Sequence, residues 1–122
     1  MTILLVEDNL LNRRLAEVTL LARGHLVLQA DSVDAARASL DRQMPDIILM
    51  DIELPGGGGE LLMREIRGQP ARAHLPIIAV TALAMQGDRE RLLEAGFDGY
   101  ISKPIDVRTF GREIESFAAR TG

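Results

Sequence analysis

Short, continuous apolar runs alternate along the chain with segments in which apolar residues recur at helical spacing. The clearest runs, at residues 3–6 and 47–50, consist of Ile, Leu, Val and Met and are bounded by polar residues. Runs of this kind are typical of strands that are buried on both faces of a parallel sheet. Together with three weaker runs, they predict strands at residues 2–6, 26–30, 46–50, 76–80 and 98–101.

Five amphipathic helices are predicted, one after each strand. Gly24 follows the first helix as a C-terminal cap, and Ser32 and Asp106 are the expected N-terminal caps of the second and last helices. The apolar positions that define the five helices are, in chain order, Leu11, Leu15, Val18 and Leu21; Ala35, Ala36 and Leu40; Leu61, Leu62 and Ile66; Leu92 and Leu93; and Phe110, Ile114 and Phe117.

This alternation of strands and helices predicts an α/β fold. It implies right-handed crossovers and a parallel sheet that is covered by helices on both faces. The expected architecture is a single doubly wound sheet of five parallel strands flanked by five helices. Because no repeat, linker or low-complexity tract interrupts the pattern, we predict one domain over residues 1–122.

Composition narrows the functional classes. Of the 122 residues, 47% are hydrophobic, which suits a globular core. The net charge of -4 and the pI near 5.1 disfavour binding to nucleic acid, which requires a basic surface. The chain lacks cysteine, a signal-peptide pattern and any apolar stretch near the roughly 20 residues of a membrane span. We therefore expect a cytoplasmic protein that binds neither nucleic acid nor membranes directly.

Three carboxylates follow the two strongest strands. Glu7 and Asp8 come after the first strand, and Asp51 comes after the third. Parallel strands end at the same edge of a sheet, where open α/β sheets bind ligands, so these carboxylates should converge. Carboxylates that share a crevice repel one another unless a cation lies among them, and Mg2+ prefers oxygen ligands. Asp51 is the candidate nucleophile, since a carboxylate can accept a phosphoryl group as a mixed anhydride.

Two further strand ends carry groups that suit a phosphoryl ligand. Thr81 follows the fourth strand and Lys103 follows the fifth. A hydroxyl can donate to one phosphoryl oxygen, and a lysine can neutralise another. Each of these residues also has a simpler interpretation: Thr81 as a helix cap, Lys103 as a solvated charge and the Glu7-Asp8 pair as acids at a helix N-terminus. The combination on strands one, three, four and five favours the phosphoryl site.

The chain resembles the receiver domain of bacterial two-component signalling, which has the CheY-like fold, over essentially its whole length. Its sequence is most similar to DivK-type single-domain regulators and to the receivers of hybrid kinases. Tyr100, three residues before Lys103, matches the switch aromatic of the family. The other matching motifs are Glu7-Asp8, Met50-Asp51-Ile52-Glu53-Leu54-Pro55, Gly59, Thr81-Ala82 and Lys103-Pro104.

The resemblance implies a strand order of 2-1-3-4-5 and a mechanism. Asp51 would accept a phosphoryl group from a histidine kinase or a histidine phosphotransfer protein. Asp8, Asp51 and the backbone carbonyl of Glu53 would bind Mg2+, with Glu7 acting through water. Thr81 and Lys103 would hold the phosphoryl oxygens, and the Lys103-Pro104 peptide would be cis. The chain would be no enzyme in the ordinary sense, because it catalyses only its own phosphorylation and dephosphorylation.

The resemblance also implies a signalling surface. Phosphorylation would draw the Thr81 hydroxyl inward and let Tyr100 rotate, which remodels the face of helix four, strand five and helix five. This face, with Ala84 and Met85, would contact a downstream protein, and the chain would be a monomer or a weak dimer. Glu53 and Leu83 occupy the two variable positions beside the phosphoryl group. Because Leu83 cannot hydrogen-bond an attacking water, slow self-dephosphorylation is expected.

Several residues depart from this pattern or fall outside it. The glycine run at residues 56–59 suggests a mobile loop and a late start for the third helix, and less strongly a nucleotide-binding loop. His25 and His74 are expected to be solvated loop residues. Arg13 and Arg14 are most simply the polar face of the first helix, and more weakly candidates for contact with a kinase.

Three alternative functions remain open from the sequence. The chain could be a receiver excised from a hybrid histidine kinase, although a stand-alone regulator is simpler. An aspartyl-nucleophile phosphatase is less favoured, since such enzymes usually carry a second Asp where this chain has Glu53. An interaction module that uses neither metal nor phosphate is the third possibility, and the complete set of site residues counts against it.

Overall fold

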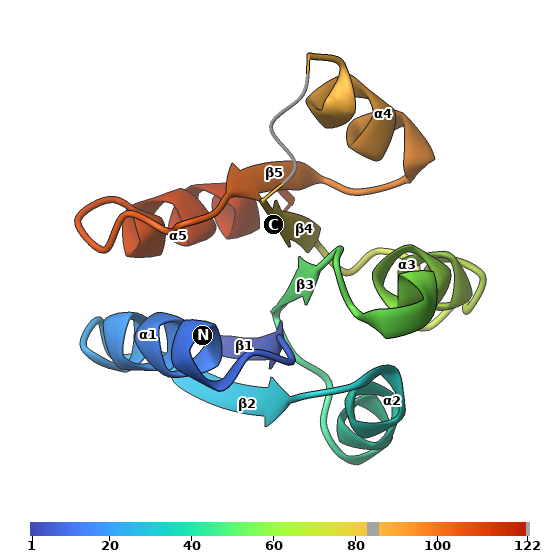
Figure 1. Ribbon diagram of the computed structural model, residues 1–122. Helices are drawn as coiled ribbons and strands as arrows, with labels where there is room; N and C mark the ends of the chain where they lie inside the picture. Colours follow the sequence, from blue (N-terminus) through green and yellow to red (C-terminus); the bar gives the residue numbers. More distant parts are fainter. Residues whose placement is uncertain (83–85, 122) are drawn as a thin grey trace.

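A five-stranded parallel sheet with the order β2-β1-β3-β4-β5 forms the centre of the molecule (Figure 1). This computed structural model describes residues 1–82 and 86–121. The predicted fold class and strand order are confirmed. The strands are β1 (Thr2–Val6), β2 (Leu26–Ala30), β3 (Ile47–Asp51), β4 (Ile77–Thr81) and β5 (Gly99–Ser102).

Three strands lie one residue later than predicted, because polar groups rather than the apolar run set their bounds. At the start of β4, the backbone N–H of Ile77 donates to the Asp98 carboxylate at 2.8 Å, and Asp98 lies just before β5. At their C-terminal ends, the ladder continues through Asp51, which pairs with Val80, and through Thr81, which pairs with Ser102. The candidate residues of β3 and β4 are therefore held inside the sheet.

Helices cover both faces of the sheet (Figure 1). Helices α1 and α5 pack on one face, and α2, α3 and α4 pack on the other. No helix in the described part of the chain is long and apolar enough to cross a membrane. The helices are α1 (Leu10–Leu21), α2 (Val33–Arg42), α3 (Gly58–Arg67), α4 (Asp88–Ala95) and α5 (Phe110–Thr121), with a short 3-10 helix η1 (Pro55–Gly57) before α3.

Alternation along the strands explains their continuous apolar sequences. In β1, Ile3 and Leu5 pack against α1 and α5, whereas Leu4 and Val6 belong to the core beneath α2, α3 and α4. Successive side chains of a strand point to opposite faces, and here both faces are covered, so every position of the run is apolar.

The apolar stripe predicted for the first helix does not face the core. Leu11 is 79% exposed and Val18 is 62% exposed, whereas Ala16 and Leu20 are buried. The helix carries more apolar residues than one contact with the sheet needs. The stripe that contains Ala16 and Leu20 is the one that packs against the core. An apolar surface is left in solvent along α1.

The helix caps form largely as expected. The Ser32 hydroxyl accepts a hydrogen bond from the backbone N–H of Ala35 at 3.1 Å, and Gly24 has a positive φ of 86° after α1. Asp106 accepts from the Arg108 N–H through its side chain and from the Phe110 N–H through its carbonyl. These contacts satisfy backbone groups that a helix end leaves without partners.

The glycine run does not delay the third helix, contrary to expectation. Helix α3 begins inside the run, at Gly58, and both Gly58 and Gly59 are buried. A Cβ atom at Gly59 would lie 2.5 Å from the carbonyl oxygen of Asp51, and one at Gly58 would lie 2.4 Å from a methyl group of Val33. These glycines let the start of α3 approach β3 and α2 closely, so their role is packing.

Candidate functional site

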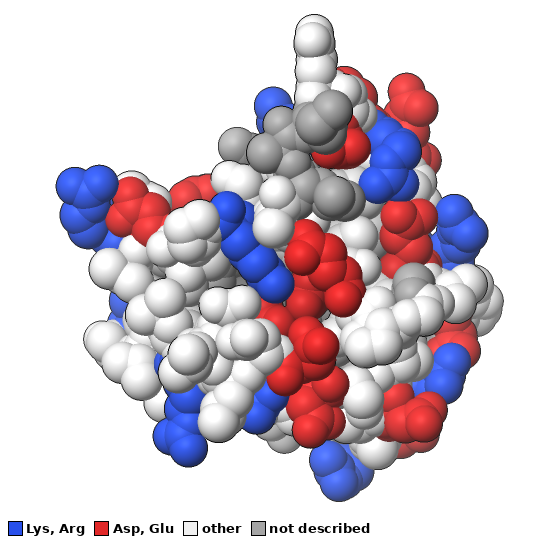
Figure 2. All heavy atoms as spheres, viewed as in Figure 1, with Lys and Arg blue, Asp and Glu red and all other residues white. Residues whose placement is uncertain are grey.

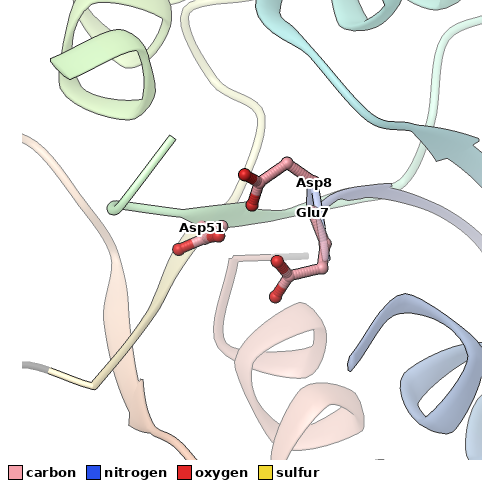
Figure 3. Close-up of side chains that lie close together, drawn as sticks. All are labelled: Glu7, Asp8 and Asp51. Carbon is pink, nitrogen blue, oxygen red and sulfur yellow. The ribbon is translucent and has the colours of Figure 1, made fainter. Parts of the chain in front are cut away.

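The predicted site residues meet at the C-terminal edge of the sheet. Glu7 and Asp8 directly follow β1, Asp51 ends β3, Thr81 ends β4 and Lys103 directly follows β5. Figure 3 shows the carboxylates of Glu7, Asp8 and Asp51 turned toward a shared space. The parallel topology brings these residues together although they are far apart in the sequence.

The three acids have the chemistry of a magnesium site. Glu7, Asp8 and Asp51 each offer a carboxylate oxygen, and these oxygens lie within 4.8 Å of one another. Asp51 is 2% exposed and Glu7 is 4% exposed, whereas Asp8 opens to solvent. An all-oxygen donor set with one side open to water fits Mg2+, which keeps several of its waters.

Lys103 joins two of these acids. Its Nζ atom lies 2.8 Å from Glu7 Oε1 and 3.2 Å from Asp51 Oδ1, and its side chain is only 14% exposed. Burial raises the pKa of Glu7, and the nearby Asp51 raises it further, although the hydrogen bond from Lys103 opposes the shift. Burial disfavours the charged ammonium of Lys103, but hydrogen bonding and attraction to Glu7 and Asp51 outweigh it and raise its pKa. The site therefore holds a lysine that stays protonated beside Asp51.

The residue two positions after Asp51 contacts the site through both its backbone and its side chain. The backbone N–H of Glu53 donates to Asp51 Oδ1 at 2.9 Å. Its Oε1 atom accepts from the Thr81 hydroxyl at 2.8 Å and from the backbone N–H of Ala82 at 2.5 Å. Thr81 is fully buried, so its hydroxyl lies beneath the surface, and the residue before it, Val80, pairs with Asp51.

The remaining expected residues have mixed outcomes. Tyr100 lies in β5 beside Ala79 of β4 and is partly buried against the core. The Lys103-Pro104 peptide is cis, as expected. The positions of the other predicted switch and modulator residues, Leu83, Ala84 and Met85, lie outside the described residues.

Of the two histidines, only His74 is solvated as predicted. The His25 side chain is 11% exposed and contacts Glu115 at 2.8 Å. The terminal amino group of Met1 lies 3.1 Å from its other ring nitrogen. The expectation failed because His25 follows a helix that packs beside α5, a neighbour that the local sequence does not reveal.

Two features of the site were missed in the sequence. The contact of the Glu53 carboxylate with Thr81 has no local signal, since it joins the loop after β3 to the end of β4. The exposed apolar face of α1 did have one: Leu, Val and Ala occupy more than half of the circumference of that helix. Arg13, by contrast, donates to the Glu7 carbonyl and to Gln29, so it ties α1 to β1 and β2.

The charge distribution singles out this edge of the molecule. Figure 2 shows a band of acidic side chains down the middle of this face, with uncharged surface beside it on the side of α1 and α5. A band of carboxylates concentrates cations, and an anionic phosphoryl group needs such a cation to enter.

Comparisons with known proteins agree with this geometry. The model of the family described as "Response regulator receiver domain" matches residues 3–115 of this chain. The polar-differentiation response regulator DivK of Brucella ovis is 39% identical over 116 residues, which cover 95% of this chain and 94% of DivK.

Two solved structures share the fold at high coverage. The receiver domain of a sensor histidine kinase from Pseudomonas aeruginosa, solved with a magnesium ion coordinated in its active-site cleft, is 41% identical, with a TM-score of 0.85 and 97% coverage of both chains. A CheY-like receiver domain protein from Methanospirillum hungatei is 26% identical, with a TM-score of 0.86 and coverage of 98% of this chain and 94% of that one. The family match, the relatives and the site at the edge of the sheet together show that this chain belongs to the response regulator receiver domains of two-component signalling.

Proposed function

We propose that residues 1–122 act as one phosphorylation-controlled switch, in which Asp51 accepts a phosphoryl group. The observation that carries this proposal is the convergence of buried Asp51 with Glu7, Asp8 and Lys103 at one edge of the sheet. A carboxylate oxygen of Asp51 attacks the phosphorus, a new P–O bond forms, and the P–N bond to the histidine of the donor protein breaks. The displaced imidazole keeps the electron pair of that bond.

The residues of the site divide this task. Asp8, Asp51 and the backbone carbonyl of Glu53 would hold Mg2+, with Glu7 contributing through water, and the ion would neutralise negative charge on the transferring group. Lys103 would neutralise a phosphoryl oxygen from the opposite side, and the Thr81 hydroxyl would donate to another. The magnesium ion in the related Pseudomonas receiver supports this assignment.

The exposed face of α1 supports a docking site for the phosphodonor. Leu11 and Leu15 lie in solvent on this face, and Leu15 lines a pocket together with Lys103, Pro104 and Ile105. An apolar surface that borders the reactive carboxylate suits a helical histidine kinase or phosphotransfer protein. Donor contact on this side would bring the phosphohistidine to Asp51 beside Lys103.

Output is proposed to use the face of α4, β5 and α5. Thr81 and Tyr100 lie on neighbouring strands that connect the site to this face. Phosphorylation would shift the population between two arrangements of these residues and change contacts with a downstream protein. Receiver domains are typically cytoplasmic, and we place this chain there as a monomer or weak dimer.

A hybrid kinase is the second setting that the comparisons favour. The Pseudomonas relative is the receiver of a sensor histidine kinase and shares 41% identity. The same site chemistry serves a free regulator and a receiver within such a kinase, so Asp51 keeps its role in both.

Replacement of the acceptor tests the proposal. Acetyl phosphate and Mg2+ should label the wild type, with attack by Asp51 on phosphorus and departure of acetate. Asp51→Asn should abolish labelling, because an amide cannot form the acyl phosphate. Intact mass measurement, which detects the added phosphoryl group, provides the readout, with Asp34→Asn, at an exposed position of α2, as the control. Normal labelling of Asp51→Asn would remove the assignment.

A further inference from the structure

A single oxygen atom of Glu53 receives two hydrogen bonds at the end of β4. The Thr81 hydroxyl donates to Glu53 Oε1 at 2.8 Å, and the backbone N–H of Ala82 donates to the same atom at 2.5 Å. A hydroxyl and an adjacent amide that converge on one anionic oxygen form a small anion-binding pair. Glu53 also connects this pair to Asp51, since its backbone N–H donates to Asp51 Oδ1 at 2.9 Å.

The same pair is placed to receive an oxygen of a phosphoryl group on Asp51. Thr81 ends β4, the strand next to β3, and the residue before it, Val80, pairs with Asp51 in the sheet. A carboxylate oxygen and a phosphoryl oxygen are both anionic acceptors, so they compete for the same two donors. The structure shows these donors engaged by a carboxylate of the chain itself.

We infer that Glu53 is an internal competitor for the phosphoryl-oxygen site and so sets how readily Asp51 accepts a phosphoryl group. This inference rests on the proposed function. The Glu53 residue is exposed, so its side chain can turn into solvent without opening the core. Thr81 and Ala82 then become available to the incoming group, and the carboxylate returns when that group leaves.

Four variants separate two effects of the Glu53 carboxylate: its occupancy of the phosphoryl-oxygen site and its negative charge. Glu53→Ala removes the carboxylate, and Glu53→Gln keeps the length but removes the charge. Glu53→Asp keeps the charge on a side chain that is one methylene shorter, which takes the carboxylate away from Thr81 and Ala82. Glu94→Ala, on the exposed surface of α4, is the control for a change of one unit in net charge.

Binding of beryllofluoride with Mg2+, followed by amide resonances, measures the competition; the chain has no tryptophan for a fluorescence assay. Glu53→Ala and Glu53→Asp should bind about tenfold more tightly than the wild type, because no charge-assisted hydrogen bonds have to be broken. Acetyl phosphate labelling of Asp51 should accelerate by a similar factor. Glu94→Ala should match the wild type.

A second readout uses the free protein without metal or ligand. The amide resonance of Ala82 should shift in Glu53→Ala and Glu53→Asp, because its acceptor is lost, and should stay unchanged in Glu94→Ala. An Ala82 amide resonance that did not shift in either Glu53→Ala or Glu53→Asp would overturn the inference.

The binding outcomes separate the two proposals. If Glu53→Asp bound like the wild type while Glu53→Gln bound more tightly, charge alone would control affinity and the occupancy idea would be wrong. Equal binding by the wild type and all Glu53 variants would also refute it, with the acceptor role of Asp51 intact. Absence of labelling in every protein would instead remove the proposed function, and the inference with it.

Discussion

Glu115 shows how a single side chain can connect two helices. Its carboxylate accepts two hydrogen bonds from the Arg23 guanidinium, at 2.6 and 2.7 Å, and one from His25 at 2.8 Å. The hydrogen bonds from Arg23 and then His25 lower the pKa of Glu115 to about 2. Gly111 on α5 leaves the space through which the Arg23 side chain passes. The cluster joins the end of α1 to α5.

The lowered pKa of Glu115 gives a stability effect with a defined pH range. A carboxyl whose pKa is lower in the folded state stabilises the fold above its unfolded value, near 4.5, and loses this effect as the pH falls toward about 2. We expect Glu115→Gln to lower the melting temperature at pH 7 by about 2–4 °C, since the pair is partly exposed and screened. The difference from wild type should shrink below pH 4.5.

Thermal unfolding at pH 7, 5 and 3.5 provides the measurement for Glu115. Glu94→Gln, which removes an exposed carboxylate on α4, should have little effect at any of these values. If the melting temperature of Glu115→Gln lay below that of the wild type by the same amount from pH 7 to 3.5, an ionic role for Glu115 would be contradicted.

The convergence of the site residues at one edge of the sheet was largely predictable. Glu7, Asp8 and Asp51 each stand next to an apolar run, and parallel strands necessarily bring such positions to one edge. The partner of the Glu53 side chain was not predictable, since its direction depends on how the loop after β3 turns toward β4.

At the scale of elements, the start of α3 packs directly on the backbone of Asp51 at the end of β3. Gly59 lies in the first turn of α3, where its missing side chain allows the Asp51 carbonyl to approach. A Cβ atom there would face backbone atoms, which cannot move aside as a flexible side chain can. We therefore expect Gly59→Ala to lower the free energy of unfolding by about 1–3 kcal/mol, as overpacking does.

Urea denaturation of Gly59→Ala and a matched glycine variant checks this expectation. At Gly68, after α3, the nearest atoms to a Cβ would lie at 3.5 and 3.6 Å, which is ordinary contact. Gly68→Ala should therefore leave stability nearly unchanged. Equal stability of both variants and the wild type would show that α3 does not pack closely against β3 at Gly59.

Helix α1 illustrates why the buried face of a helix is harder to predict than the helix itself. Its sequence contains two apolar stripes, and periodicity alone does not indicate which one meets the sheet. The structure buries the stripe of Ala16 and Leu20 and exposes Leu11, Leu15 and Val18. Ala16 and Leu20 join the core cluster that contains Ile3 of β1.

At the scale of the whole molecule, phosphorylation should change the structure along one side of the sheet. Adding beryllofluoride and Mg2+ should shift amide resonances around residues 82–103, because Thr81 and Tyr100 link the site to the face of α4, β5 and α5. Resonances of β2 should change little, since this strand forms the opposite edge of the sheet.

The measurement is a pair of amide correlation spectra for the wild type, with Asp51→Asn as the control that should not respond. An unchanged spectrum for residues 82–103 in the wild type, with beryllofluoride bound at the site, would contradict a switch on this face.

The sequence by itself determined the alternation of strands and helices, the parallel sheet and the set of acids, hydroxyl and lysine at its edge. Continuous apolar runs are stable only where both faces of a sheet are covered, so the pattern permits few other folds. Tertiary structure alone decided which face of α1 is buried, why Gly58 and Gly59 are needed and which donors Glu53 meets. These outcomes depend on the direction of side chains and on neighbours distant in the chain, whereas a local pattern records only whether a position suits an apolar or a polar environment.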